Sequence, residues 1–99
     1  MLRNPKNRDQ RPFLSIVIPA YNEEQRLFDT LEKINTYLSQ QKYEYEIIVV
    51  DDGSTDETVS KVKRLSTTSE HVKLLVNKTN RGKGYTVKKG MMRAQGRYV

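Results

Sequence analysis

Short apolar runs rich in β-branched residues alternate along this chain with segments that have the periodicity of amphipathic helices. The runs occupy residues 13–19, 45–50 and 72–76, and we predict each as a buried strand. Strands that alternate with helices pair in parallel, because a right-handed crossover returns each strand beside its neighbour and leaves a helix on the sheet. The alternation therefore predicts an α/β fold built on a parallel sheet.

Three helices are predicted, in residues 24–40, after the capping-box sequence of residues 54–57, and in residues 85–95. Residues 97–99 have the pattern of the first residues of a fourth strand. The order β-α-β-α-β-α-β predicts a Rossmann-like, mostly parallel sheet with helices on both faces. The predicted inward positions of the helices are Leu27, Leu31, Ile34 and Leu38, then Val59, Val62 and Leu65, then Val87, Met91 and Ala94.

The composition excludes several classes of site. The 99 residues include no cysteine and one histidine, which excludes disulfides, thiol nucleophiles and metal sites built on cysteine or on histidine clusters. No apolar run approaches about 18 residues, so the sequence predicts no membrane-spanning helix. Residues 1–12 are polar and basic, lack the apolar core of a signal peptide, and are interpreted as a flexible N-terminal arm before one domain in residues 13–99.

The charge is distributed unevenly along the chain. Residues 71–99 contain eight lysines and arginines and no acidic residue, whereas residues 1–70 contain ten basic and twelve acidic residues. A basic segment next to an acidic one indicates an anionic partner such as a phosphate group, a nucleic acid or a lipid surface. A solvated basic face is the alternative interpretation.

Ligands of open parallel sheets bind beyond the carboxyl ends of the strands, which directs attention to the loops that follow each predicted strand. In the first loop, residues 19–24, the Tyr21 ring can stack on a base and Glu23 can accept a hydrogen bond from one. Acidic residues are also common in the first turn of a helix, so an ordinary strand-to-helix turn remains the alternative.

The second loop begins with two adjacent carboxylates, Asp51 and Asp52, directly after a buried strand. Such a pair is costly unless a cation or hydrogen-bond donors receive it, and it can accept from a ribose hydroxyl or a base. The third loop, residues 77–84, departs from the Walker A and Gly-x-Gly-x-x-Gly motifs. It places Lys83 between two glycines near a helix N-terminus, where an anion is favoured, although a flexible basic loop would look the same.

Three motifs in this order resemble the N-terminal half of glycosyltransferase family 2, which has the GT-A fold. They are LSIVIPAYNEE at 14–24, YEIIVVDDGSTDET at 45–58 and NRGKGYTVKKGMMRAQGRYV at 80–99, so the resemblance covers residues 14–99. The third motif is most similar to the dolichyl- or polyprenyl-phosphate glucosyl- and mannosyltransferases. Residues 13–99 are accordingly identified as the nucleotide-sugar-binding part of such a domain, without its remainder.

The resemblance implies a nucleotide-sugar site. Pro19, Ala20 and Tyr21 would line the base pocket, and Glu23 would contact the base or the ribose. Either Asp51 or Asp52 would hold the base edge or the ribose, and Lys83 would lie near the diphosphate. The residues of this implied site are Pro19, Ala20, Tyr21, Glu23, Asp51, Asp52 and Lys83.

The family reaction is inverting transfer of a hexose from a UDP-sugar or GDP-sugar to an acceptor, here a polyprenyl or dolichyl phosphate or a growing glycan. The resemblance implies a divalent cation, Mg²⁺ or Mn²⁺, which offsets charge on the leaving diphosphate. The family's Asp-x-Asp motif follows the strand begun at 97–99, so we expect no metal ligand or catalytic residue within this chain and no transfer by it alone. We expect a cytoplasmic location, with the cytoplasmic face of a membrane as an open alternative.

Two interpretations from other classes stay open. The basic C-terminal third could bind nucleic acid through phosphate contacts, although its two tyrosines do not resemble a stacking platform. A receiver-like signalling module could use the acidic pair and a later lysine. In this chain, however, the pair follows the second strand rather than the first.

Overall fold

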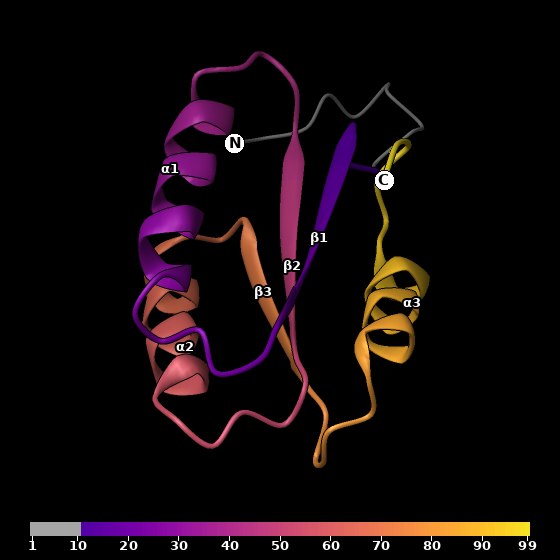
Figure 1. Ribbon diagram of the computed structural model, residues 1–99. Coiled ribbons are helices and arrows are strands. Elements are labelled where there is room, and N and C mark those ends of the chain that lie inside the picture. The colour runs from indigo at the N-terminus through magenta and orange to yellow at the C-terminus, as the bar shows by residue number, and fades with distance from the viewer. Residues whose placement is uncertain (1–10) are drawn as a thin grey trace.

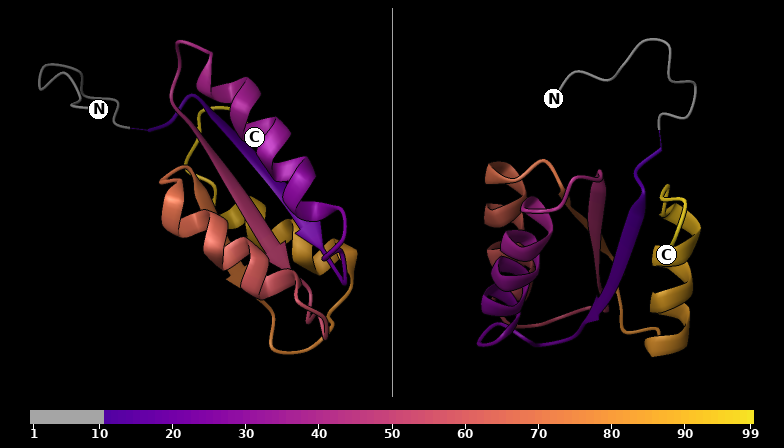
Figure 2. Two further views of the ribbon diagram at one scale, coloured as in Figure 1. Left: turned by 90° about the vertical axis from the view of Figure 1, so that its left-hand side faces the viewer. Right: turned by 90° about the horizontal axis from the view of Figure 1, so that it is seen from above.

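In the computed structural model, which describes residues 11–99, a three-stranded parallel sheet lies between two layers of helix (Figure 1). The spatial order of the strands is β1-β2-β3, and they span Leu14–Ala20, Tyr45–Asp51 and Val72–Val76. Helices α1 (Leu27–Ser39) and α2 (Thr58–Thr68) cover one face of the sheet, and α3 (Lys83–Arg93) covers the other (Figure 2). The predicted α/β class and its helices on both faces are confirmed.

The central strand β2 is buried along its whole length because both of its faces and both of its edges are covered. Ile47 and Val49 pack into the core formed with α1 and α2. Val50 points to the opposite face, where it meets α3. Alternate side chains of a strand face opposite sides of the sheet, so a strand covered on both faces reads as a continuous apolar run.

Helix α3 approaches the sheet through its smallest side chains. Thr86 and Gly90 are its buried residues, whereas Met91 is 53% exposed. A Cβ atom at Gly90 would overlap the Cγ1 of Val17, so the helix backbone is in contact with the sheet. The prediction that Val87, Met91 and Ala94 form the inner face is therefore wrong, because close backbone approach selects small residues and turns the larger ones outward.

After α3 the chain returns to β1, on the edge opposite β2. Tyr98 forms a parallel bridge with Leu14, the Ser15 N–H donates to the Tyr98 carbonyl at 2.8 Å, and the Tyr98 N–H donates to Phe13 at 3.0 Å. Of the strand start predicted at residues 97–99, the structure shows this single bridge at Tyr98. The N-terminal arm predicted for residues 1–12 lies outside the described residues except for Arg11 and Pro12. None of the helices described between residues 11 and 99 is long and apolar enough to cross a bilayer.

The contact at Gly90 predicts a stability change of definite sign. We expect Gly90→Ala to lower the free energy of unfolding by about 1–3 kcal/mol, since the added methyl group overlaps the side chains of Val17 and Val50 and forces them or the helix to shift. This loss outweighs the gain of about 1 kcal/mol that alanine brings to a helix interior. Urea denaturation measures the net change in the free energy of unfolding.

Gly84→Ala is the matched control in the same helix. A Cβ atom there meets nothing within 4 Å, so the substitution should be neutral or stabilising. Equal destabilisation by the two substitutions would contradict the close approach of α3 to the sheet.

Candidate functional site

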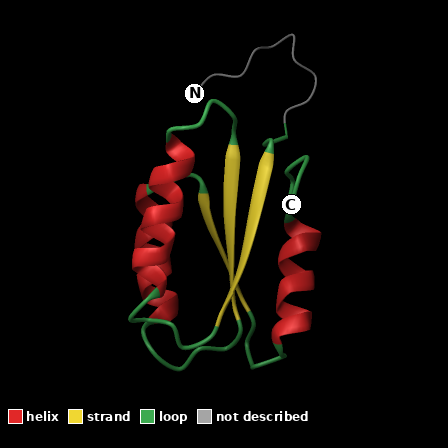
Figure 3. Cartoon of the chain, turned by 45° about the horizontal axis from the view of Figure 1, so that its top comes forward, coloured by secondary structure: helices red, strands yellow, loops and turns green. Residues whose placement is uncertain are grey.

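The carboxyl ends of the three strands meet at one edge of the sheet, where the loops after β1, β2 and β3 lie together (Figure 3). The ladder of hydrogen bonds continues past the strand ends: the Asp52 N–H donates to the Ala20 carbonyl and the Asn77 N–H donates to the Asp51 carbonyl, both at 2.8 Å. Three loops that are distant in sequence are therefore held side by side from their first residues.

The loop after β1 is fastened to the loop after β2 by reciprocal hydrogen bonds. The Asn22 N–H donates to the Ser54 hydroxyl at 2.8 Å, and the Asn22 side-chain oxygen accepts from the Thr55 N–H at 2.9 Å. Asn22 has a left-handed backbone (φ 49°), which its short polar side chain tolerates better than most. One residue further, the Glu23 N–H donates to the Thr58 hydroxyl at 2.9 Å.

Asp51 is committed to its own loop. Its carboxylate accepts from both the N–H and the hydroxyl of Ser54. The capping box predicted at residues 54–57 is wrong for that reason, and α2 begins instead at Thr58, whose N–H and hydroxyl donate to Asp56. Burial raises the pKa of Asp56, but the hydrogen bonds from Thr58 and Glu24 outweigh it and hold that pKa below its usual value.

Asp52 reaches across to the loop after β3. Its carboxylate accepts from the Arg81 N–H at 2.7 Å, the Gly82 N–H at 3.0 Å and the Asn77 side-chain amide at 3.0 Å. The Arg81 and Asn77 hydrogen bonds are the main reason that the pKa of Asp52 lies below its usual value. Gly53 (φ 78°) permits this approach, because a Cβ atom there would lie 2.7 Å from the backbone nitrogen of Asn80.

The side chains of Thr86, Asn77 and Lys89 form a second set of hydrogen bonds at the start of α3. Thr86 donates its hydroxyl hydrogen to the Gly82 carbonyl at 2.7 Å and accepts from the Asn77 side-chain amide at 3.1 Å. Lys89 donates to the side-chain oxygen of Asn77 at 2.9 Å. The backbone around Gly82 is thus held by Asp52 on one side and by Thr86 and Asn77 on the other.

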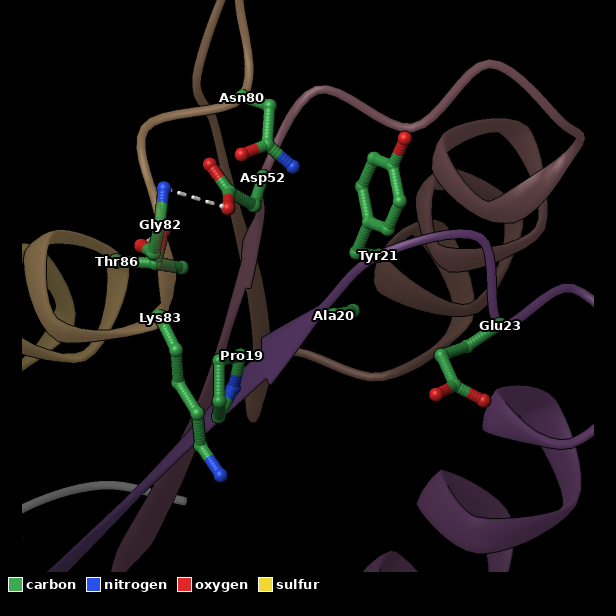
Figure 4. A pocket seen from close by; sticks show the side chains of 9 residues that line it. All are labelled: Pro19, Ala20, Tyr21, Glu23, Asp52, Asn80, Gly82, Lys83 and Thr86. Atoms are coloured by element: carbon green, nitrogen blue, oxygen red, sulfur yellow. Dashed lines mark hydrogen bonds between the residues drawn. The ribbon is translucent and has the colours of Figure 1, made fainter.

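These loops enclose a cavity of about 390 Å³ (Figure 4). Residues at the end of β1 and in the loop after it face residues of the β3–α3 loop and of α3 across the cavity. Six of the seven residues implied by the family resemblance line it, and Asp51 does not. The lining residues are Pro19, Ala20, Tyr21, Glu23, Asp52, Asn80, Gly82, Lys83 and Thr86.

Three of these lining residues were missed by the sequence analysis, namely Asn80, Gly82 and Thr86. The first two belong to the Asn-Arg-Gly-Lys-Gly segment from which only Lys83 was selected. Thr86 lies three residues after Lys83, which places both on one face of a helix. That spacing was the signal in the sequence that could have identified it.

The chemistry of the lining suits a ligand that has both a flat ring and an anionic group. Tyr21 offers a phenol ring and is 47% exposed. Lys83 is the first residue of α3, where its charge adds to the positive end of the helix dipole. Glu23 pairs with Arg26 at 3.1 Å, so its carboxylate is partly neutralised at the rim.

The acidic residues do not form a metal site by themselves. Within residues 11–99, no group of three or more histidine, aspartate or glutamate side chains is arranged to hold a metal ion. Of the two acidic residues that line the cavity, Asp52 already accepts from Arg81, Gly82 and Asn77. The described residues therefore supply no complete ligand set of their own for the divalent cation implied by the resemblance.

Comparison with known proteins places this geometry in context. Residues 15–99 match the family model described as Glycosyl transferase family 2. The chain is 39% identical over 100 residues to a dolichyl-phosphate beta-glucosyltransferase of Dictyostelium discoideum, covering 94% of this chain and 31% of the relative. The Drosophila melanogaster protein of the same name is 45% identical over 91 residues, covering 85% and 28%. The chain thus spans about three tenths of the length of these relatives.

Two solved structures share the fold. The mannosyltransferase PcManGT from Pyrobaculum calidifontis, in complex with GDP-Man and Mn²⁺, superposes with a TM-score of 0.64 at 29% identity, covering 85% of this chain and 25% of that one. S. aureus TarS 1–349 in complex with UDP superposes with a TM-score of 0.71 at 26% identity, covering 88% and 26%. Neither the nucleic-acid-binding nor the receiver-like interpretation gains support from these matches.

The hydrogen bonds of Asp52 predict a local effect of its neutralisation. Asp52→Asn replaces a carboxylate by an amide that has one acceptor oxygen and two donors. We expect the Arg81 and Gly82 amides to exchange with solvent at least about tenfold faster, because they lose a charged acceptor and the loop opens more often. NMR-detected hydrogen exchange measures this, and Asp51→Asn, which should act on Ser54 instead, is the control.

The pH dependence of the same loop follows from the lowered pKa of Asp52. The contribution of this carboxylate is fully present above the ordinary pKa of an aspartate and is lost as the pH falls through the lowered value in the folded chain. We therefore expect protection of the Gly82 amide to persist at about pH 5 and to decline in stronger acid. An equal acid dependence in Asp52→Asn would contradict the assignment to Asp52.

Proposed function

Because the chain belongs to glycosyltransferase family 2, we propose that it binds the nucleotide-sugar donor of a hexosyltransferase in the cavity at the carboxyl ends of its strands. The observation that carries the proposal is the composition of that cavity. It brings the Tyr21 ring, the Asp52 carboxylate and the Lys83 ammonium group together from three separate segments.

The proposed orientation of the donor follows from where these groups lie. The base would rest against Pro19, Ala20 and the ring of Tyr21, at the end of β1. The diphosphate would lie toward Lys83 and the amides of the first turn of α3, which have no partner within the helix. Of the two aspartates, Asp52 is the one we assign to the donor site, since it lines the cavity and Asp51 does not.

For the whole protein we propose transfer of a hexose from a UDP-sugar or GDP-sugar to dolichyl or polyprenyl phosphate. The acceptor is supported by the two relatives described above, both of which are dolichyl-phosphate beta-glucosyltransferases. The donor class is supported by the structural neighbours, one in complex with GDP-Man and the other with UDP. A growing glycan is the alternative acceptor. We propose a cytoplasmic location, with the cytoplasmic face of a membrane as the alternative.

We also propose that a divalent cation accompanies the donor, as Mn²⁺ accompanies GDP-Man in the mannosyltransferase complex. The ion would offset charge on the departing diphosphate. The part that residues 11–99 play in this proposal is to bind and orient the nucleotide.

Calorimetric titration with UDP, GDP, their hexose conjugates and the corresponding nucleosides tests the donor site. We expect the diphosphates to bind more tightly than the nucleosides. Lys83→Ala should weaken diphosphate binding about tenfold or more, because a hydrogen bond to a charged group contributes about 1.5–3 kcal/mol. Nucleoside binding should be unchanged by the same substitution.

Lys88→Ala is the matched control, since Lys88 is an exposed lysine of the same helix that does not line the cavity. An equal loss in both variants, or a steep salt dependence without competition by nucleotide sugars, would favour a general polyanion-binding surface. Failure of every nucleotide to bind would contradict the proposed function.

A further inference from the structure

A carboxylate is buried in the central strand at the end of the sheet opposite the cavity. Glu46 lies in β2 and is 2% exposed, and it belongs to no part of the proposed donor site. A buried charge is costly unless it is paired and hydrogen-bonded, and a well-packed apolar side chain in its place is often no less stable. Its partners therefore indicate what the charge is used for.

Each oxygen of this carboxylate has a defined partner. Oε1 accepts from the Lys73 ammonium group at 2.8 Å. Oε2 accepts from the Ser15 hydroxyl at 2.5 Å and from the Gln95 N–H at 2.6 Å. Burial raises the pKa of Glu46, but these three hydrogen bonds outweigh it and hold the pKa below its usual value. Glu46 therefore joins all three strands and the chain that leaves α3.

Ser15 also connects Glu46 to Gly96, the residue after Gln95. Its hydroxyl, which donates to Glu46, accepts from the Gly96 N–H at 2.8 Å. A Cβ atom at Gly96 would lie 2.5 Å from the Ser15 hydroxyl oxygen and 2.7 Å from the Ser15 nitrogen, so the two backbones are in contact. Two residues later, Tyr98 forms its parallel bridge with Leu14.

The contacts of Gln95, Gly96 and Tyr98 fix the register at which the chain after α3 joins β1. In Figure 1 the C-terminus lies beside the first residues of β1, at the end of the sheet far from the loops that form the cavity. Ala20, which lines the cavity, follows Leu14 by six residues along β1. Because the Leu14–Tyr98 bridge is parallel, the chain at Tyr98 runs in the same direction as β1, toward the cavity.

We propose that Glu46 is a positioning residue that sets the register at which the segment after α3 pairs with β1, through Gln95, Ser15 and Gly96. Its purpose rests on the proposed function: the segment that pairs with β1 in this register runs parallel to it, toward the edge of the sheet where the donor cavity lies. A slip of one residue would turn every side chain of the strand to the opposite face of the sheet. A buried charge that demands one arrangement of donors excludes such slips better than an apolar contact does.

The register can be measured directly, because the chain has no cysteine of its own. A nitroxide attached to Val99→Cys should broaden the NMR signals of β1 most strongly around Ser15, the residue after the partner of Tyr98. In Glu46→Gln we expect the broadening to spread along β1 or to shift its maximum by at least one residue. Glu32→Gln, a neutralisation on the exposed surface of α1, should leave the profile unchanged.

Hydrogen exchange gives the second readout and separates positioning from general stabilisation. In Glu46→Gln, the amides of Gln95, Gly96 and Tyr98 should exchange at least about tenfold faster, whereas those of Arg81 and Gly82 at the cavity should not change. Ser15→Ala should release Gly96 and Tyr98 but leave Gln95 protected, since that amide donates to Glu46 directly.

Two results would overturn the proposal that Glu46 sets this register. Uniformly faster exchange across the sheet, with an unchanged broadening profile, would make Glu46 a general stabiliser and overturn it. An unchanged profile with unchanged exchange would do the same. Affinity for UDP and GDP is measured on the same variants and should not change. Failure of the unsubstituted chain to bind either nucleotide would overturn the proposed function, while the register measurement would still stand.

Discussion

The central strand β2 pairs in parallel with β1 and β3 at once, and the features that bear on function are anchored to it. Its carboxyl end leads into Asp51 and Asp52, which organise the loops around the cavity. Its amino end carries Glu46, which holds the chain leaving α3. Because the strand is buried on both faces, these carboxylates have fixed positions. The backbone N–H groups that donate hydrogen bonds to them are held in place as a result.

Parallel pairing explains why one cavity can draw on segments far apart in the sequence. The right-handed crossovers bring the ends of β1, β2 and β3 to one edge. Hydrogen bonds between loops then set their spacing, from Asn22 to Ser54 and Thr55 on one side and from Asp52 to Arg81 and Gly82 on the other. Each loop is thus hydrogen-bonded to its neighbour. The cavity lies between the loop after β1 and the loop after β3, which lie on either side of the loop after β2.

The sequence predicted the parts of this arrangement that depend on periodicity and topology. Apolar runs identified the strands, and parallel order placed the ligand site at their carboxyl ends. Contacts between segments distant in sequence were not predictable in the same way. Adjacent residues of a strand point to opposite faces, so either aspartate of the pair could have faced the cavity. The buried face of α3 was predicted wrongly because Gly90 packs directly against the sheet, where only a small residue fits. That close approach depends on tertiary packing, which the helical periodicity of the sequence does not reveal.

The two adjacent carboxylates also resolve a question that composition alone left open. A buried pair needs either a cation or hydrogen-bond donors, and here donors receive both members. Asp51 binds Ser54 of its own loop, whereas Asp52 binds two backbone amides of the next loop. The two aspartates therefore have different structural roles. Asp51 stabilises the turn after β2, and Asp52 connects that turn to the start of α3. Removing the charge of either should disturb a different loop, because the two carboxylates share no donor among the described residues.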